Sequence, residues 1–125
     1  MGNNGGDAFP TCHFPFTDSN IYDAALRTAR VNVGDPTPSL AAWRVYEIVS
    51  TATEWTVKLD GTQIFTTGTN TVGLIASPLL GLGADNSYYM RGSQAGMYLF
   101  SAKMSSGDRT SLINYINSRF GLSSS

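Results

Sequence analysis

Two glutamates are the first residues whose chemistry would suggest catalysis, because a pair of carboxylates held across a sugar can hydrolyse a glycosidic bond. Glu47 and Glu54 are the only glutamates of the chain, and they lie seven positions apart. Two carboxylates at alternate positions of one strand point to the same face. No well-patterned strand of this chain carries such a pair. We therefore expect a protein that is not an enzyme of this kind and has no catalytic residues.

Cys12 and His13 are the only cysteine and the only histidine. A nucleophilic thiol or a Ser-His-Asp triad would have to use them, but neighbours in an extended segment point to opposite faces. One histidine and one cysteine also cannot supply the usual ligand set of a transition metal. The pattern favours a partly buried structural thiol and a structural or surface imidazole.

Hard oxygen ligands of the sort that calcium prefers occur in one loop, at Asp18, Asn20 and Asp23. Their spacing is not that of an established calcium loop. Aspartate and asparagine are also common in loops because their side chains bond to nearby backbone amides. We favour turn-forming roles for the three residues, and calcium is the one cofactor for which they are candidate ligands.

An aromatic and amide-rich stretch is the stronger candidate for a binding site. Tyrosine rings can stack on sugar rings while nearby amides and charges bond to hydroxyl groups. The candidate ligand-binding residues are Asp85, Asn86, Tyr88, Tyr89 and Arg91. Trp43 and Trp55 could serve in the same way, but their alternation with valine and leucine predicts core positions first.

The composition limits the classes of partner. Eight basic and nine acidic residues give a formal net charge of −1, and the basic residues are scattered singly. Nucleic-acid and anionic-membrane surfaces need clustered positive charge, and no apolar run reaches the roughly 20 residues that span a bilayer. We expect neither partner. The single cysteine and the lack of a leader-like start predict synthesis in the cytoplasm without a signal peptide.

The 125 residues suit one domain, with residues 1–8 as a flexible lead. Short β-patterned runs separated by turn residues occupy most of the chain. We predict strands over residues 27–33, 42–50, 72–76, 79–82 and 96–103. The last of these carries apolar residues on both faces, which is typical of a strand buried on both sides.

Two further elements have strong local signals. Asp60 and Gly61 separate two β-patterned runs, 55–59 and 63–67, which predicts a tight hairpin. Near the end the apolar period changes to that of a helix. Ser105 and Asp108 approximate a capping box, and Gly121 suits a left-handed cap, so we predict a helix within residues 105–121.

With these elements placed, the chain resembles the concanavalin A-like lectin/glucanase superfamily, and within it the laminin-G-like jelly-roll domains of phage structural and adhesion proteins. The closing segment at residues 105–122, SSGDRTSLINYINSRFGL, carries the resemblance most specifically. The Asp60-Gly61 hairpin, the LGLG run at 80–83 and the stretch at 13–23, HFPFTDSNIYD, add to it. The resemblance implies an all-β antiparallel sandwich (jelly roll) with one short C-terminal α-helix.

Complete members of that superfamily have several strands before the part that matches here. Either the sandwich is a reduced one, or a neighbouring chain supplies strands, or the chain is a fragment. Open sheet edges favour a homo-oligomer or a larger assembly. The resemblance implies a non-catalytic module at a virion or extracellular surface, binding glycan or neighbouring protein subunits. The alternatives are a purely structural virion protein without a glycan ligand and, less favoured, a fragment of a glycoside hydrolase.

Overall fold

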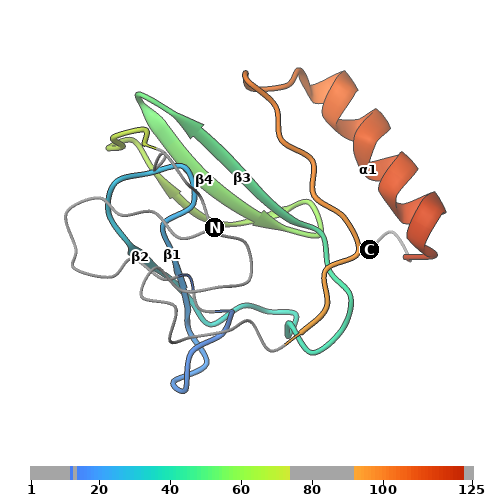
Figure 1. The fold of residues 1–125 in the computed structure, drawn as a ribbon, viewed down its shortest axis with the longest axis horizontal. Coiled ribbons are helices and arrows are strands. Elements are labelled where there is room, and N and C mark those ends of the chain that lie inside the picture. Colours follow the sequence, from blue (N-terminus) through green and yellow to red (C-terminus); the bar gives the residue numbers. More distant parts are fainter. Residues whose placement is uncertain (1–11, 13, 74–91, 123–125) are drawn as a thin grey trace.

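The computed structural model describes residues 12, 14–73 and 92–122 of the chain, and within them five strands and one helix (Figure 1). The elements are β1 (Ile21–Asp23), β2 (Val31–Gly34), β3 (Tyr46–Thr51), β4 (Glu54–Leu59), β5 (Thr62–Thr67) and α1 (Ser106–Phe120). The described protein is therefore mostly β, with two antiparallel sheets and a C-terminal helix, as the sequence predicts at this level.

The larger sheet is a meander in which β4 lies between β3 and β5. The predicted hairpin at Asp60 and Gly61 is confirmed, because these two residues connect β4 to β5 and both have positive φ, at 49° and 87°. Aspartate and glycine tolerate that conformation better than other residues do. The smaller sheet pairs β1 with β2.

The hydrophobic core lies between the two sheets. Ile21 of β1 and Val33 of β2 pack against Trp55 and Val57 of β4, and all four are buried. Alternation along β4 explains this arrangement, because its odd-numbered residues point to the core and its even-numbered residues to the other face. That other face of the larger sheet is the one toward residues 92–105 and α1.

The start of β3 differs from the prediction of a strand over residues 42–50. The strand begins only at Tyr46, which pairs with Leu59, the last residue of β4. Residues before Tyr46 have no strand opposite them, and the backbone of Val45 bonds instead to Asp60 in the hairpin turn. The predicted core position of Trp43 is therefore wrong.

The predicted strand at residues 27–33 is correct only at its end, where β2 begins at Val31. Arg27 forms an isolated bridge to Val72, and a turn with Leu26 at φ 58° precedes it. The three-residue strand β1 was not predicted, because the run that contains it lacks a clear apolar period.

Residues 96–103 form no strand, which corrects the prediction of a strand buried on both faces. The segment runs between the larger sheet and α1 (Figure 1), and its apolar side chains are exposed. Its alternating pattern was real, but no described strand lies beside it to complete a ladder. Residues 1–11 and 74–91 lie outside the described part. The predicted lead and the predicted strand at 79–82 therefore fall outside it, as does the strand predicted at 72–76 from residue 74 on.

The helix is confirmed together with both of its caps. The Ser105 hydroxyl accepts a hydrogen bond from the Asp108 N–H, and Gly121 adopts the left-handed conformation at φ 64°. No residue of α1 is fully buried. The helix is tied to the sheet by a bidentate ion pair between Arg109 and Glu47 of β3.

Candidate functional site

The binding site predicted from the sequence lies outside the described part of the chain. This holds for all five residues, Asp85, Asn86, Tyr88, Tyr89 and Arg91. His13 lies outside it as well.

The fold separates Asp23 from the other two calcium candidates, Asp18 and Asn20. The Asp18 carboxylate accepts hydrogen bonds from the Asn20 N–H at 3.0 Å and the Tyr22 hydroxyl at 2.7 Å. These two bonds lower the pKa of Asp18 below its usual value. This is the turn-forming role that the sequence favoured.

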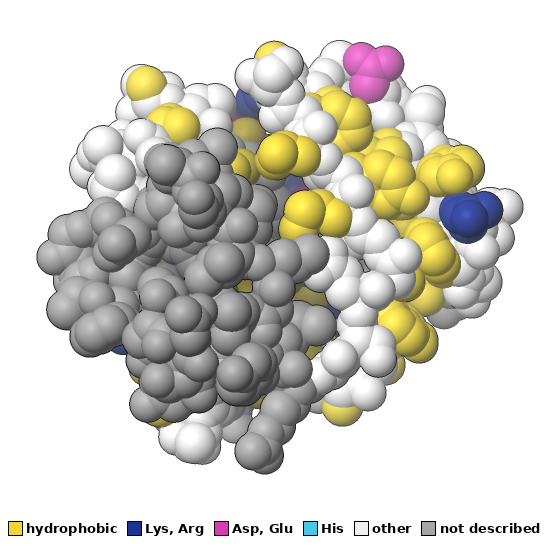
Figure 2. Space-filling view, viewed as in Figure 1, with side chains coloured by type: hydrophobic (Ala, Val, Ile, Leu, Met, Phe, Trp, Pro, Cys, Tyr) yellow, Lys and Arg dark blue, Asp and Glu magenta, His cyan; other side chains and the backbone are white. Residues whose placement is uncertain are grey.

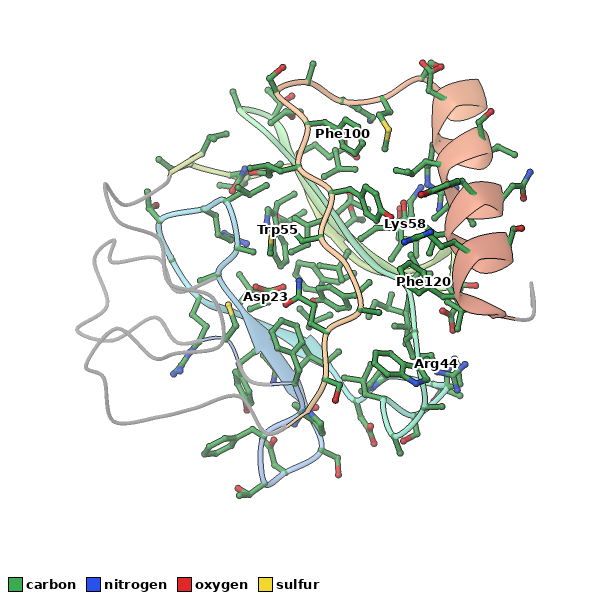
Figure 3. All side chains as sticks on the ribbon, turned by 45° about the vertical axis from the view of Figure 1, so that its right-hand side comes forward. Asp23, Arg44, Trp55, Lys58, Phe100 and Phe120 are labelled. Atoms are coloured by element: carbon green, nitrogen blue, oxygen red, sulfur yellow. The ribbon has the colours of Figure 1, made fainter. Side chains whose placement is uncertain are left out.

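Asp23 follows Tyr22 on β1 and therefore points to the opposite face, into the protein interior (Figure 3). It is fully buried. Within residues 14–73 and 92–122 together with Cys12, no three histidine, cysteine or acidic side chains are placed to hold a metal ion. The structure therefore does not bring Asp18, Asn20 and Asp23 together as ligands.

Asp23 instead organises a buried polar cluster. Its carboxylate accepts hydrogen bonds from the Tyr46 hydroxyl at 2.7 Å, the Ala25 N–H at 2.8 Å and the Cys12 thiol at 3.1 Å. Burial, with the nearby Asp23 charge, raises the pKa of Cys12 to about 12. A nucleophilic cysteine needs a lowered pKa, so this environment suits a structural thiol.

The two tryptophans have opposite surroundings. Trp55 is fully buried, and its indole N–H donates to the Ala25 carbonyl at 2.9 Å. Trp43 precedes β3 and is 58% exposed. An indole is costly to leave in water, so an exposed one beside a cleft is a candidate ligand contact.

Trp43 borders a cleft of about 370 Å³ between the chain before β3 and the C-terminal half of α1. This volume falls within the roughly 300–1,000 Å³ of small-molecule sites. The cleft is lined by Ala42, Trp43, Arg44, Val45, Asp60, Ile113, Asn114, Asn117, Gly121 and Leu122. Figure 3 shows Arg44 near the C-terminal end of α1.

One wall of the cleft is held in place by the hairpin turn. Asp60 accepts hydrogen bonds from Arg44 at 3.0 Å and from the Val45 N–H at 2.9 Å. The Arg44 Nε also donates to the Ser39 carbonyl at 3.0 Å. The residues next to Trp43 are thus fixed before any ligand arrives. The Arg44–Asp60 ion pair also leaves this wall without a net charge.

The opposite wall is provided by α1. Asn114 and Asn117 are three positions apart and so lie on neighbouring parts of one helix face. Within the described part of the chain neither side-chain amide forms a hydrogen bond. Their donors and acceptors are therefore available to a ligand.

The sequence pointed to only part of this cleft. Trp43 was named as a possible sugar contact, but alternation assigned it to the core. The asparagine pair was missed, although Asn114 and Asn117 stand at helical spacing next to the apolar positions of a well-predicted helix. The pairing of the helix wall with residues 42–45 depends on tertiary structure and has no local signal.

Comparisons with protein-family models, with curated proteins and with solved structures found no match. The functional interpretation therefore depends on the chemistry of the cleft. In the portion of the chain that is described, no helix has the length and apolar character needed to span a bilayer.

Proposed function

We propose that this protein is a non-catalytic β-sandwich module that binds an uncharged glycan in the cleft beside Trp43. The observation that carries the proposal is the exposed indole opposite two asparagine amides that have no partner in the described structure. The ring offers a flat apolar face for the C–H face of a sugar, and the amides offer donors and acceptors for its hydroxyls. The neutral Arg44–Asp60 wall favours a ligand without charge.

The fold is consistent with this function. Two antiparallel sheets face each other across one core, and a helix with the predicted caps closes the chain. These features support our proposal that the chain is a jelly-roll sandwich of the concanavalin A-like, laminin-G-like type. The surface of a virion or cell is the setting in which such a module would act as an adhesion protein.

The glutamates support a non-catalytic function. Register pairs Glu47 with Lys58, which lies four residues from Glu54 along β4. At about 3.3 Å per residue, the two glutamate backbones stand roughly 13 Å apart. Each carboxylate is also occupied by a cation, Glu47 by Arg109 and Glu54 by Lys103.

The test is a glycan array probed with wild type, Trp43→Ala and a double Asn114→Ala, Asn117→Ala variant. Phe16→Ala is the matched control, because Phe16 is also an exposed aromatic residue but lies outside the cleft. We expect wild type and control to bind the same glycans. The cleft variants should bind at least tenfold more weakly, which corresponds to about 1.4 kcal/mol.

A Tyr88→Ala, Tyr89→Ala variant separates the cleft from the loop that the sequence favoured. Loss of binding in that variant, with Trp43→Ala unaffected, would show that the cleft is the wrong site. If wild type binds no glycan at all, the binding function is discarded. The purely structural virion protein then becomes the better explanation.

A further inference from the structure

Residues 92–104 form an extended segment whose backbone pairs with no strand among the described residues. None of these residues takes part in a backbone-to-backbone hydrogen bond within the described structure. The one hydrogen bond to its backbone comes from the Gln94 side chain to the Gly96 carbonyl at 3.3 Å. A row of N–H and C=O groups in this state can accept another strand.

The side chains of this segment form part of an exposed apolar band, which we define as Met97, Tyr98, Leu99, Phe100, Tyr115 and Phe120. Figure 2 shows hydrophobic side chains gathered over the part of the surface formed by this segment and α1. The band is continuous at its centre. Tyr98 meets Tyr115 edge to face with ring centroids 6.5 Å apart. A methyl group at Gly96 would lie 3.5 Å from the Tyr98 ring and 3.7 Å from the Phe120 ring.

The size of the apolar band matches a dimer interface. Its members are between 36% and 60% exposed. With roughly 200 Å² for each fully exposed large side chain, these fractions amount to roughly 550 Å² per copy. Complete burial of the band in both copies would cover roughly 1,100 Å², which is just above the ~1,000 Å² expected of a specific interface.

The segment is also complementary to itself. Residues 92–102 contain no charged side chain, so two copies can meet without repulsion between like charges. In an antiparallel pair centred on Tyr98, Met97 lies opposite Leu99 of the second copy. Gly96 lies opposite Phe100 of the second copy in this register. Antiparallel pairing about one residue is a two-fold symmetric contact, the commonest symmetry of protein dimers.

We propose that two copies of this chain pair through residues 95–101 as antiparallel strands and bury the apolar band in a two-fold symmetric dimer. The proposed dimer contact does not include Trp43, Asn114 or Asn117, so glycan binding and self-association can be tested with separate variants.

Sedimentation analysis of the full chain, at concentrations up to about 100 μM, tests the dimer by its concentration-dependent mass. Wild type should have twice the mass of the chain, and Leu99→Lys should weaken self-association at least tenfold. Leu99 is 60% exposed, so lysine there is compatible with the folded chain. Trp43→Lys is the matched control, since Trp43 is 58% exposed outside the band, and it should remain dimeric.

An added cysteine tests the register, in a Cys12→Ala background where it is the one thiol of the chain. Tyr98→Cys should give a disulfide-linked dimer on mild oxidation, because residue 98 faces itself across the two-fold axis. Phe16→Cys should not. Far-UV circular dichroism checks that each variant is folded, and Met97→Lys replaces Leu99→Lys if the latter is not. A monomeric wild type would overturn the proposal. Self-association that Leu99→Lys and Met97→Lys leave unchanged would overturn it as well.

Discussion

Removing the Asp23 carboxylate should destabilise this protein more than any other single loss of a polar group among the described residues. Asp23 joins three separate parts of the chain, because its partners lie at Cys12, in the turn after β1 and on β3. Asp23→Ala leaves the Tyr46 hydroxyl and the Ala25 N–H without an acceptor in a buried site. The thiol loses its acceptor as well.

The magnitude follows from these bonds. A buried donor that loses its partner costs about 1–3 kcal/mol, and a hydrogen bond to a charged group contributes about 1.5–3 kcal/mol. Two strong donors and a thiol would give up to about 5 kcal/mol. The carboxylate no longer has to be desolvated, which offsets part of the loss. We expect the free energy of unfolding to fall by about 3 kcal/mol, which for a chain of this size lowers Tm by about 10 °C.

Urea unfolding followed by circular dichroism measures this change. Asp23→Asn should lose only about 1 kcal/mol, because its amide oxygen still accepts from Ala25 and its NH₂ group can donate to the Tyr46 oxygen. Asp18→Ala is the control, since Asp18 also accepts two hydrogen bonds but is exposed. If Asp23→Ala loses no more stability than Asp18→Ala, the buried cluster does not hold these elements together.

Three other predictions concern the thiol, the helix cap and the helix attachment. Because the Cys12 pKa is raised from 9.0 to about 12, the folded state retains a proton that the unfolded state loses, so stability should decrease as the pH rises through this window. The free energy of unfolding should fall by up to about 1.4 kcal/mol per pH unit, and this dependence should disappear in Cys12→Ala. Urea unfolding at several pH values measures it. Gly121→Ala should lower the free energy of unfolding by about 1 kcal/mol. The positive φ is the cause, because a methyl group at this position has open space around it. Gly92→Ala, where the space is equally open, is the control and should leave thermal unfolding unchanged. A double-mutant cycle of Arg109→Gln and Glu47→Gln should give a coupling energy of about 1 kcal/mol, and a coupling of zero would mean that the ion pair does not attach α1 to the sheet.

The elements that were predicted correctly have local causes. The cap residues Ser105 and Gly121 define the ends of α1, and Asp60 with Gly61 defines a two-residue hairpin. In each case the decisive hydrogen bonds and dihedral angles lie within a few residues of the signal. Such features can be derived from one sequence.

The elements that were predicted wrongly depend on a distant partner. Alternation at residues 96–103 indicated a strand, but a strand also needs a neighbour, and the pattern cannot show whether one is present. Trp43 has the same alternation, yet β4 ends opposite Tyr46, so the ladder stops before Trp43 is reached. The cleft could not be predicted for the same reason, because its two walls meet only in the folded chain.

Quenching of tryptophan fluorescence tests the glycan cleft most directly, because the chain has two tryptophans and only Trp43 is exposed. Iodide should quench the Trp43 emission of wild type and leave Trp43→Phe, which retains the buried Trp55, almost unchanged. A saturating concentration of the glycan that scores highest on the array should protect Trp43 from iodide. If that glycan binds while iodide still quenches Trp43 to the same extent, the glycan does not occupy this cleft.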